Sequence, residues 1–336
     1  MEKLNVGILG YDHVHVLRYV PAFLNAQNAR ITKVAATGAN KERARSDADS
    51  IGCSFYEDLD GFFDDLDAVY VGTTPPEHKE VVKMASESGV HVLCDKPLAL
   101  NLRDADEILR CASSNNIKLM APFNPRFQIP FIRAKEMIGG GELGKLQYIY
   151  AVKYGKSPRY IKGMDTSWFF DPERAGFGGF GDIGIHAIDA LRWLSDSKVK
   201  RVYADIGRRI DGTIGIADLG SMMVTFENEV IACLSAGWAN PIGYPKGLDV
   251  RFEILGTKGA LLIEKPYHDF IISDKERSEE QDWWRVDTQS VVNEFLDSII
   301  EDREPVINGE DARAALEILI AGYLSAEKGR EIELPL

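Results

Sequence analysis

An aspartate and a histidine four positions apart are the first residues in this chain that could do chemistry together. Asp182 and His186 stand in the stretch GGFGDIGIHAID, and Asp189 follows three positions after the histidine. Side chains at positions i and i+4 share one face of a helix. An imidazole with a pKa near neutrality can take the proton that a hydroxyl group loses when its carbon is oxidised. The same spacing also suits a salt bridge at a helix start, so spacing alone leaves both interpretations open.

A lysine at the end of an apolar run is the second candidate. Lys96 follows HVLC in the stretch HVLCDKP. A cationic lysine beside a reacting hydroxyl would stabilise the alkoxide that develops there. An isolated lysine at the end of a strand is otherwise most often a solvated charge. If the strand belongs to an open parallel sheet, however, its carboxyl end lies at the ligand-binding edge, which favours a functional role.

The first apolar run leads into a loop that matches a dinucleotide-binding turn only in part. The stretch VGILGYDHVH places Gly10 correctly, but the pattern Gly-x-Gly-x-x-Gly fails at Asp12 and His15. A carboxylate at position 12 would repel a pyrophosphate unless it points away or a cation intervenes. His13 or His15 could supply that compensation, or both could be exposed residues at a helix start. The loop alone therefore predicts either a nucleotide site or a simple turn.

The elements that must position these residues fall into two patterns. Residues 4–121 alternate between short apolar runs and helix-like segments, which predicts a doubly wound α/β domain with a parallel sheet. Residues 122–336 carry closely spaced apolar runs separated by turns such as ENE and GTKG, which predicts a mostly antiparallel open sheet. A chain of 336 residues is also long enough for two domains. In the second half, helices are expected at about 180–194, 290–300 and 310–328.

The composition excludes several classes of protein. A formal net charge of -13 argues against a general affinity for nucleic acid or an anionic membrane, because such surfaces need clustered Lys and Arg. The four cysteines are scattered without metal-ligand spacing, so neither a disulfide framework nor a metal site is expected. No leader segment and no apolar run of roughly 20 residues is seen, so a cytoplasmic protein is expected.

Three stretches together resemble the glucose-fructose oxidoreductase and myo-inositol dehydrogenase family, also called Gfo/Idh/MocA. They are VYVGTTPPEHKEVVKMASESGVHVLCDKPLAL, NPRF and GGFGDIGIHAID, and the tail PVINGEDARAALEILIAGYLSAEKGREIELP is similar as well. The resemblance implies an NAD(P)-dependent dehydrogenase or reductase acting on a sugar, sugar acid or cyclitol. It further implies a Rossmann domain over residues 1–121. Residues 122–336 would form a substrate-binding domain whose open sheet assembles homodimers or homotetramers.

The resemblance also implies roles for individual residues. Lys96 would contact both the nicotinamide and the reacting hydroxyl, and Asp182 and His186 take the positions of the substrate-contacting aspartate and the catalytic histidine. Whether His186 takes the proton directly or through Lys96 stays open. Asp95 stands where the family usually has glutamate, which puts the contacts of that carboxylate in doubt. The residues assigned to the cofactor are Gly10, Tyr11, Asp12, His13, Thr37, Gly38, Lys41, Arg43, Thr73, Thr74, Pro75, His78, Asp95, Lys96 and Arg126; those assigned to the substrate are Lys96, Asn124, Tyr154, Asp182 and His186.

The end of the second predicted strand favours NADP over NAD. An acidic residue at this point usually binds the adenosine ribose of NAD, and here the position falls at Gly38. Thr37 offers a hydroxyl, and Lys41 and Arg43 offer positive charge for a 2′-phosphate. The Thr-Gly pair also resembles the Ser-Gly of NADP-binding members of the family. The alternative is that both cations are solvated and that NAD binds through its other contacts.

The glycines and tryptophans give further expectations. Gly176, Gly178, Gly179 and Gly181 would let the backbone pass close to a ligand. Trp168 is expected in the core, and Trp238, Trp283 and Trp284 in the core or a subunit interface. Met222, Val224 and Phe226 alternate along one predicted strand and are expected to face a partner subunit.

Two other functions stay open. One is a non-catalytic regulator that binds a nucleotide or sugar, against which the retention of Lys96, Asp182 and His186 speaks. The other is a glycosidase that uses bound NAD as a transient redox partner. Such a glycosidase would hold its nucleotide tightly and show no net turnover of it.

Overall fold

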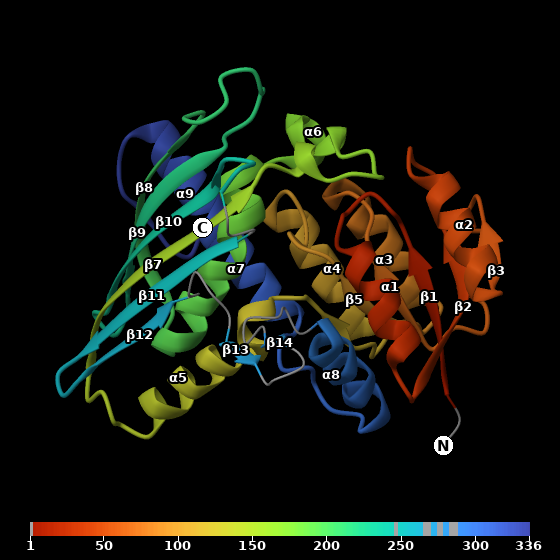
Figure 1. Ribbon diagram of the computed structural model, residues 1–336, viewed down its shortest axis with the longest axis horizontal. Helices are drawn as coiled ribbons and strands as arrows, with labels where there is room; N and C mark the ends of the chain where they lie inside the picture. The colour runs from red at the N-terminus through yellow and green to blue at the C-terminus, as the bar shows by residue number, and fades with distance from the viewer. Residues whose placement is uncertain (1–2, 245–247, 265–269, 274–277, 282–287) are drawn as a thin grey trace. The chain divides into compact units, whose positions relative to one another are not determined.

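The computed structural model describes residues 3–244, 248–264, 270–273, 278–281 and 288–336, and these fall into two compact units (Figure 1). The first unit consists of Met1–Phe123, Ile161–Gly178 and Thr288–Glu317. The second consists of Asn124–Tyr160, Gly179–Asp287 and Ile318–Leu336. Two later segments of the chain thus join the N-terminal part in the first unit. The division of cofactor and substrate roles at residue 121 stays a prediction.

The first unit is built on a six-stranded parallel sheet with the strand order β3-β2-β1-β4-β5-β6. This confirms the predicted doubly wound domain. β3 was not predicted, because its three residues are too few to show a period. The strands are β1 (Leu4–Leu9), β2 (Ala29–Ala35), β3 (Ser54–Tyr56), β4 (Ala68–Val71), β5 (His91–Cys94) and β6 (Leu119–Met120).

Helices cover this sheet. Helix α8 belongs to the first unit although it lies far along the chain, and it packs against α1, beside which it is drawn in blue in Figure 1. The 3-10 helix η1 (Pro75–Glu77) precedes α3, and η4 (Ser167–Phe170) precedes the short helix α6 (Pro172–Ala175). The longer helices of the unit are α1 (Val16–Asn25), α2 (Lys41–Ile51), α3 (His78–Glu87), α4 (Leu102–Ser114) and α8 (Thr288–Ile300).

A glycine ends β1 because no other residue fits there. Gly10 has a φ of +86°, which L side chains rarely adopt. A Cβ on Gly10 would stand 2.5 Å from the backbone nitrogen of Thr73. The turn therefore brings the loop after β1 against the end of β4, at the carboxyl edge where ligands of open parallel sheets bind.

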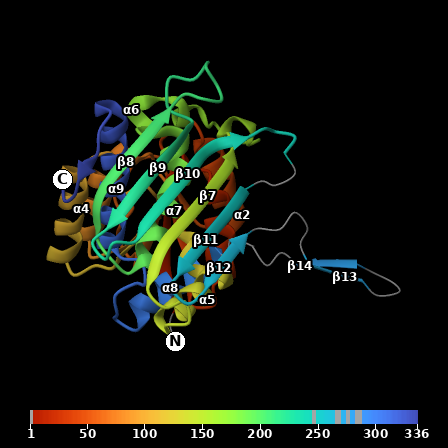
Figure 2. The same ribbon diagram turned by 90° about the vertical axis from the view of Figure 1, so that its left-hand side faces the viewer.

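The second unit contains a seven-stranded sheet with the order β12-β11-β7-β10-β9-β8-β15, seen face-on in Figure 2. Only β7 and β10 pair in parallel, so the predicted mostly antiparallel sheet is confirmed. The strands are β7 (Leu146–Lys156), β8 (Val199–Gly207), β9 (Leu219–Phe226), β10 (Ile231–Asn240), β11 (Leu248–Gly256), β12 (Ala260–Glu264) and β15 (Ile332–Glu333). A separate pair is formed by β13 (Phe270–Ser273) and β14 (Ser278–Gln281).

The predicted helices of the second half are present. The helix expected near residues 180–194 is α7 (Gly178–Ser195), and the last expected helix is α9 (Gly309–Lys328). Three short elements connect the strands: η2 (Asn124–Phe127), α5 (Ile129–Gly139) and η3 (Pro158–Tyr160). Among the described residues, no helix combines the length and apolarity needed to cross a membrane.

The expectation for the face of β9 was wrong. Met222, Val224 and Phe226 are 2%, 2% and 1% exposed and belong to the core. A Cβ on Gly322 would collide with Met222 Cε, so this face is covered by the part of α9 that belongs to the same unit. Alternation along a strand defines two faces but does not say which one a helix covers. The open face instead carries Met223, which is 45% exposed.

Candidate active site

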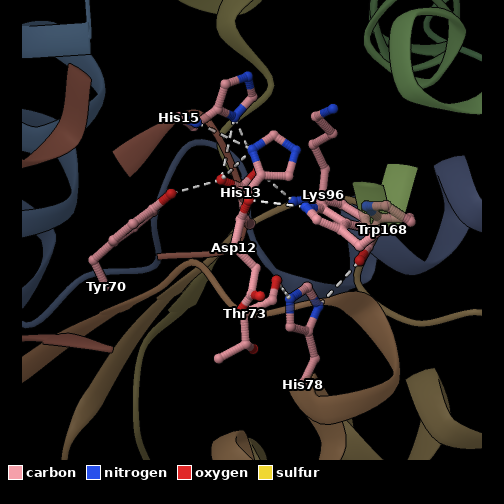
Figure 3. A network of polar contacts seen from close by, with 10 residues as sticks. Asp12, His13, His15, Tyr70, Thr73, His78, Lys96 and Trp168 are labelled. Atoms are coloured by element: carbon pink, nitrogen blue, oxygen red, sulfur yellow. Dashed lines mark hydrogen bonds and ion pairs between the residues drawn. The ribbon is translucent and has the colours of Figure 1, made fainter. Parts of the chain in front are cut away.

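Lys96 lies just beyond the end of β5, at the carboxyl edge of the parallel sheet, and its side chain is drawn in Figure 3. It is only 2% exposed, although lysine is rarely so buried in proteins. The interpretation of Lys96 as a solvated charge is therefore wrong. A cation that the fold keeps out of water at this edge is suited to face a bound molecule.

Asp95, the residue before Lys96, has no exposed surface and accepts several hydrogen bonds. Its Oδ2 accepts the Tyr70 hydroxyl at 2.7 Å, and its Oδ1 accepts the Lys96 backbone N–H at 2.7 Å. The Nδ1 atom of His15 lies 3.1 Å from Oδ1, and Nδ1 of His13 lies 3.5 Å from Oδ2. Burial alone would raise the pKa of Asp95, but the facing histidines outweigh it and hold this pKa well below its usual range.

In the turn after β4, some residues have structural contacts and one keeps a side-chain group that could bind a ligand. Thr74 caps η1, since Glu77 Oε2 accepts both its backbone N–H at 3.0 Å and its hydroxyl at 2.6 Å. Pro75 begins that 3-10 helix and is buried. The hydroxyl of Thr73 is buried and has no hydrogen-bond partner among the described residues. Thr73 is therefore the residue of this turn with hydrogen-bonding capacity left for a ligand.

His78, assigned to the cofactor by the family resemblance, is fully buried. Its Nδ1 lies 3.1 Å from the Pro97 carbonyl oxygen, and its Nε2 lies 3.2 Å from the Thr73 carbonyl oxygen. Burial lowers the pKa of His78. The ring ties the turn after β4 to the turn that follows Lys96, which makes it a positioning residue for both.

Asp12 points toward Gly38. A Cβ built on Gly38 would stand 2.9 Å from Asp12 Oδ1, so the carboxylate fills the space beside that glycine. Arg174 Nη2 lies 3.3 Å from the same oxygen, and the Trp168 indole N–H donates to the Asp12 carbonyl at 2.9 Å. Burial, followed by the charge of Glu77, raises the pKa of Asp12 to about 6 against the opposing effect of Arg174.

The two cations expected around a 2′-phosphate already have protein contacts, as has the neighbouring Asn40. Asn40 donates its side-chain amide N–H to the Asp165 carbonyl and accepts the Asp165 backbone N–H. Arg43 donates to the Gly163 carbonyl at 3.5 Å. Lys41 lies 3.8 Å from a carboxylate oxygen of Glu57. Thr37 is exposed, whereas Tyr11 is buried.

In the second unit, Asp182 and His186 lie on α7, and His186 is buried. Asp182 Oδ2 accepts the Trp238 indole N–H at 2.9 Å. Trp238 is 3% exposed and therefore lies in the core. It also fixes the carboxylate of Asp182, which the sequence could not show because the two residues are 56 positions apart. Trp168 is also buried as expected, while Trp283 and Trp284 lie outside the described residues.

Of the four glycines at the start of α7 and just before it, two serve packing. A Cβ on Gly179 would stand 2.5 Å from the Asp218 carbonyl oxygen and 2.8 Å from the Trp238 ring. Gly176 has a φ of +70°, and its Cβ would stand 2.5 Å from Leu100. At these two positions the missing side chain leaves room for neighbouring atoms of the protein itself. That finding replaces the expectation that they make room for a ligand.

Arg126 and Asp189 form a buried ion pair that was not predicted. Arg126 Nε donates to Asp189 Oδ2 at 2.9 Å, and its Nη2 donates to Oδ1 at 2.5 Å. Asp189 has no exposed surface, and burial raises its pKa while the Arg126 charge opposes the rise. The pair is thus part of the interior and not of the surface. Its expected contact with the cofactor stays a prediction.

The remaining substrate candidates lie around β7 and η2. The side-chain oxygen of Asn124 is buried and has no hydrogen-bond partner among the described residues, which leaves it able to accept from a ligand. The Tyr154 hydroxyl donates to the Ser235 hydroxyl at 2.8 Å. Arg159 pairs with Asp211 at 2.7 Å, and Tyr160 is exposed.

Comparisons with known proteins agree with this architecture. Residues 4–123 match a family model described as an oxidoreductase family with an NAD-binding Rossmann fold, and residues 131–262 match the GFO/IDH/MocA C-terminal domain. The chain is 24% identical over 349 residues to myo-inositol 2-dehydrogenase of Thermotoga maritima, covering 98% of each protein. It is 30% identical over 244 residues to myo-inositol dehydrogenase Hyg17 of Streptomyces leeuwenhoekii, covering 71% of this chain and 67% of that protein.

A solved structure shows the same fold. Scyllo-inositol dehydrogenase from Lactobacillus casei, with NAD(H) and scyllo-inositol bound, matches with a TM-score of 0.83 and 21% identity over 99% of both chains.

Proposed function

Because the chain belongs to the Gfo/Idh/MocA family of oxidoreductases, with its NAD-binding Rossmann fold, we propose that it is a dehydrogenase or reductase of sugars or cyclitols. It would transfer a hydride between a nicotinamide cofactor and a secondary alcohol or ketone of a sugar, sugar acid or cyclitol. The observation that carries this proposal is the buried Lys96, one of the family's reacting residues, held at the carboxyl edge of the sheet. The inositol dehydrogenases among its relatives support the substrate class.

The residues at the edge of the first unit fit a dinucleotide at two points. Gly10 keeps the tight turn that such a loop needs, and Thr73 has a buried hydroxyl without a protein partner. When bound, the nicotinamide accepts or delivers the hydride. The protein must then hold the reacting hydroxyl, remove its proton and exclude water.

Each of these tasks has a candidate residue. Lys96 would stabilise the oxygen as it loses its proton, and His186 would take that proton. Asp182, fixed by the Trp238 N–H, would orient the substrate or the imidazole. Asn124 offers a buried acceptor for a further substrate hydroxyl. Lys96 belongs to the first unit, and His186, Asp182 and Asn124 belong to the second.

Two measurements test the proposal against its alternatives. Absorbance of reduced nicotinamide should change when the protein is mixed with NAD or NADP and the right member of a panel of sugars and cyclitols. A nucleotide that stays bound through purification without net turnover would support the NAD-dependent glycosidase instead. Binding of a sugar without any turnover would support a non-catalytic regulator. We propose that the protein works in the cytoplasm, where both cofactors are available.

The position of Asp12 leads us to propose NAD, rather than the NADP that the sequence favours, as the preferred cofactor. An aspartate at position 38 would carry its oxygens about 2.4 Å from its own Cβ. Asp12 Oδ1 lies 2.9 Å from where that Cβ would stand. Asp12 thus supplies, from the loop after β1, a carboxylate close to where the ribose-binding acid of NAD-selective domains lies.

The Asp12→Asn variant tests this choice of cofactor. At pH 8 we expect the wild-type protein to bind NAD more tightly than NADP by calorimetry, and we expect Asp12→Asn to reduce that ratio about tenfold, since the 2′-phosphate no longer meets a carboxylate. Asp49→Asn, the same change on the exposed side of α2, is the matched control. Tighter binding of NADP by the wild type would instead assign Arg174 to the 2′-phosphate.

We also propose that the open face of the second unit's sheet joins subunits into a dimer or tetramer. Met223, Tyr203 and Ile231 are 45%, 47% and 40% exposed on neighbouring strands. Sedimentation at micromolar concentration should give a dimer or tetramer, and Met223→Lys should shift it toward the monomer. A monomeric wild type would contradict the proposal, whereas Ile129→Lys, at an exposed position outside the sheet, should change nothing.

A further inference from the structure

Two histidines and an aspartate bring their ligand atoms together at the carboxyl edge of the parallel sheet. Figure 3 labels the two histidines. His13 and His15 come from the loop after β1, and Asp95 follows β5. One ligand atom from each side chain lies within 4.8 Å of the other two. The ring centroids of the two histidines are 4.2 Å apart.

The separations match those between neighbouring ligands of one metal ion. With bonds of about 2.0–2.1 Å, two ligand atoms of a tetrahedral zinc site are about 3.3 Å apart. Here Nδ1 of His15 lies 3.1 and 3.2 Å from the two Asp95 oxygens, and Nδ1 of His13 lies 3.5 Å from Oδ2. The separations of both histidines from Asp95 are therefore already close to those that a metal ion requires.

A metal ion would replace one of the contacts of His13. The His15 backbone N–H donates to His13 Nδ1 at 3.2 Å. An ion bound through Nδ1 would take the place of this donor. Asp95 Oδ2 lies 3.5 Å from the same nitrogen and could bind the same ion.

The surroundings hold the three side chains in place. The Tyr70 hydroxyl and the Lys96 N–H bind the Asp95 oxygens, and each oxygen keeps a second lone pair. The His13 ring packs against Trp168 and Phe169, with centroids 5.7 and 5.4 Å away. Hydrogen bonds that orient the metal-binding side chains, like those to Asp95, are typical of metal sites.

From this geometry we propose that His13, His15 and Asp95 bind one divalent transition metal ion, of which zinc is the best match. Two imidazoles and one carboxylate are a donor set that binds zinc and iron(II), with positions left for an oxygen ligand. The ion would lie at the edge where ligands of such sheets bind. This proposal departs from the expectation of no metal site, because that expectation was drawn from the spacing of the cysteines. The proposal does not depend on the proposed reaction.

The test uses the full-length protein, freed of its affinity tag and stripped of metal with EDTA, in the absence of nucleotide and substrate. Titration with CoCl₂ should show one Co²⁺ bound per chain, with the visible absorption bands of Co²⁺ at a low coordination number. Addition of ZnCl₂ should displace the Co²⁺ and remove these bands. His15→Ala and His15→Gln should each weaken binding at least about tenfold, because even residues that only orient a ligand contribute that much. The His15 side chain is 21% exposed, and His15→Gln keeps a polar group near Asp95.

Matched variants separate the site from other histidines. His91→Asn keeps an acceptor for the Lys118 backbone N–H, which His91 Nδ1 accepts at 2.9 Å, and should bind Co²⁺ like the wild type. Circular dichroism of every variant should match the wild type. If the wild type retains no ion, or if both His15 variants bind as tightly as it does, the site is a proton-sharing cluster and the proposal is wrong.

Discussion

Replacing either Lys96 or His186 is expected to lower kcat by about 100- to 10,000-fold, the range typical of a lost acid-base group. Lys96→Met and His186→Gln keep much of the side-chain volume, so the fold should survive. Both residues are buried. In the proposed reaction they act in the step in which the substrate hydroxyl loses or gains its proton, so we expect their loss to lower kcat. Steady-state rates from the absorbance of reduced nicotinamide, with calorimetric Kd values for the cofactor, measure the effect.

Two controls distinguish chemistry from structural damage. Lys118→Met removes another nearly buried lysine of the first unit, which pairs with Asp302 and Glu304 instead of facing the ligand edge. Its kcat should stay within a few-fold of the wild type. The double variant of Lys96 and His186 should lose little more than either single variant, since residues that act as a unit are not additive. Wild-type kcat in either single variant would remove that residue from the mechanism.

The fold was predictable where local pattern decides structure. Continuous apolar runs ending in Gly10 and in the DKP stretch predicted the parallel sheet and its ligand edge, because both features depend on neighbouring residues. The sequence could not place α8 beside α1, since the two helices are more than 250 positions apart along the chain. It also could not decide which side of β9 faces the helices, because Met222 and Met223 are equally apolar.

The site was predictable in its residue types and less so in its contacts. Lys96, Asp182 and His186 stand out through motifs, but their partners come from distant parts of the chain. Trp238 reaches Asp182 across 56 positions, and Asp12 fills the space beside Gly38 only because the loop after β1 folds toward the end of β2. The histidine cluster was missed for the same reason, as Asp95 lies 80 positions from His15.

The buried pair of Arg126 and Asp189 gives the largest effect that we expect on stability. Asp189→Asn removes the negative charge while keeping the shape, and leaves the Arg126 guanidinium buried beside an uncharged amide. Breaking a buried pair in this way costs about 3–5 kcal/mol of the free energy of unfolding. Burial lowers the pKa of Arg192, and the charge of Arg192 also acts on Asp189. Removing the charge of Asp189 therefore affects two buried arginines, and the loss should lie at the upper end of this range. Urea unfolding followed by circular dichroism measures it.

An exposed pair on α5 is the matched control. Arg133 and Glu136 are 64% and 58% exposed and lie 3.0 Å apart, so Glu136→Gln should cost less than about 1 kcal/mol. The double variant Arg126→Leu with Asp189→Leu should recover most of the stability that Asp189→Asn loses, because apolar residues can replace a buried ion pair at little cost. Equal midpoints for Asp189→Asn and Glu136→Gln would show that the buried pair contributes nothing beyond a surface pair.

The same double variant decides what Arg126 does in the folded protein. If the guanidinium serves only to neutralise Asp189, the double variant should fold and bind NAD with the wild-type Kd, because both members of the pair are gone together. If Arg126 also contacts the cofactor, as the family resemblance implies, the Kd should rise although the fold is stable. Since both guanidinium contacts to Asp189 are short and buried, we expect an unchanged Kd.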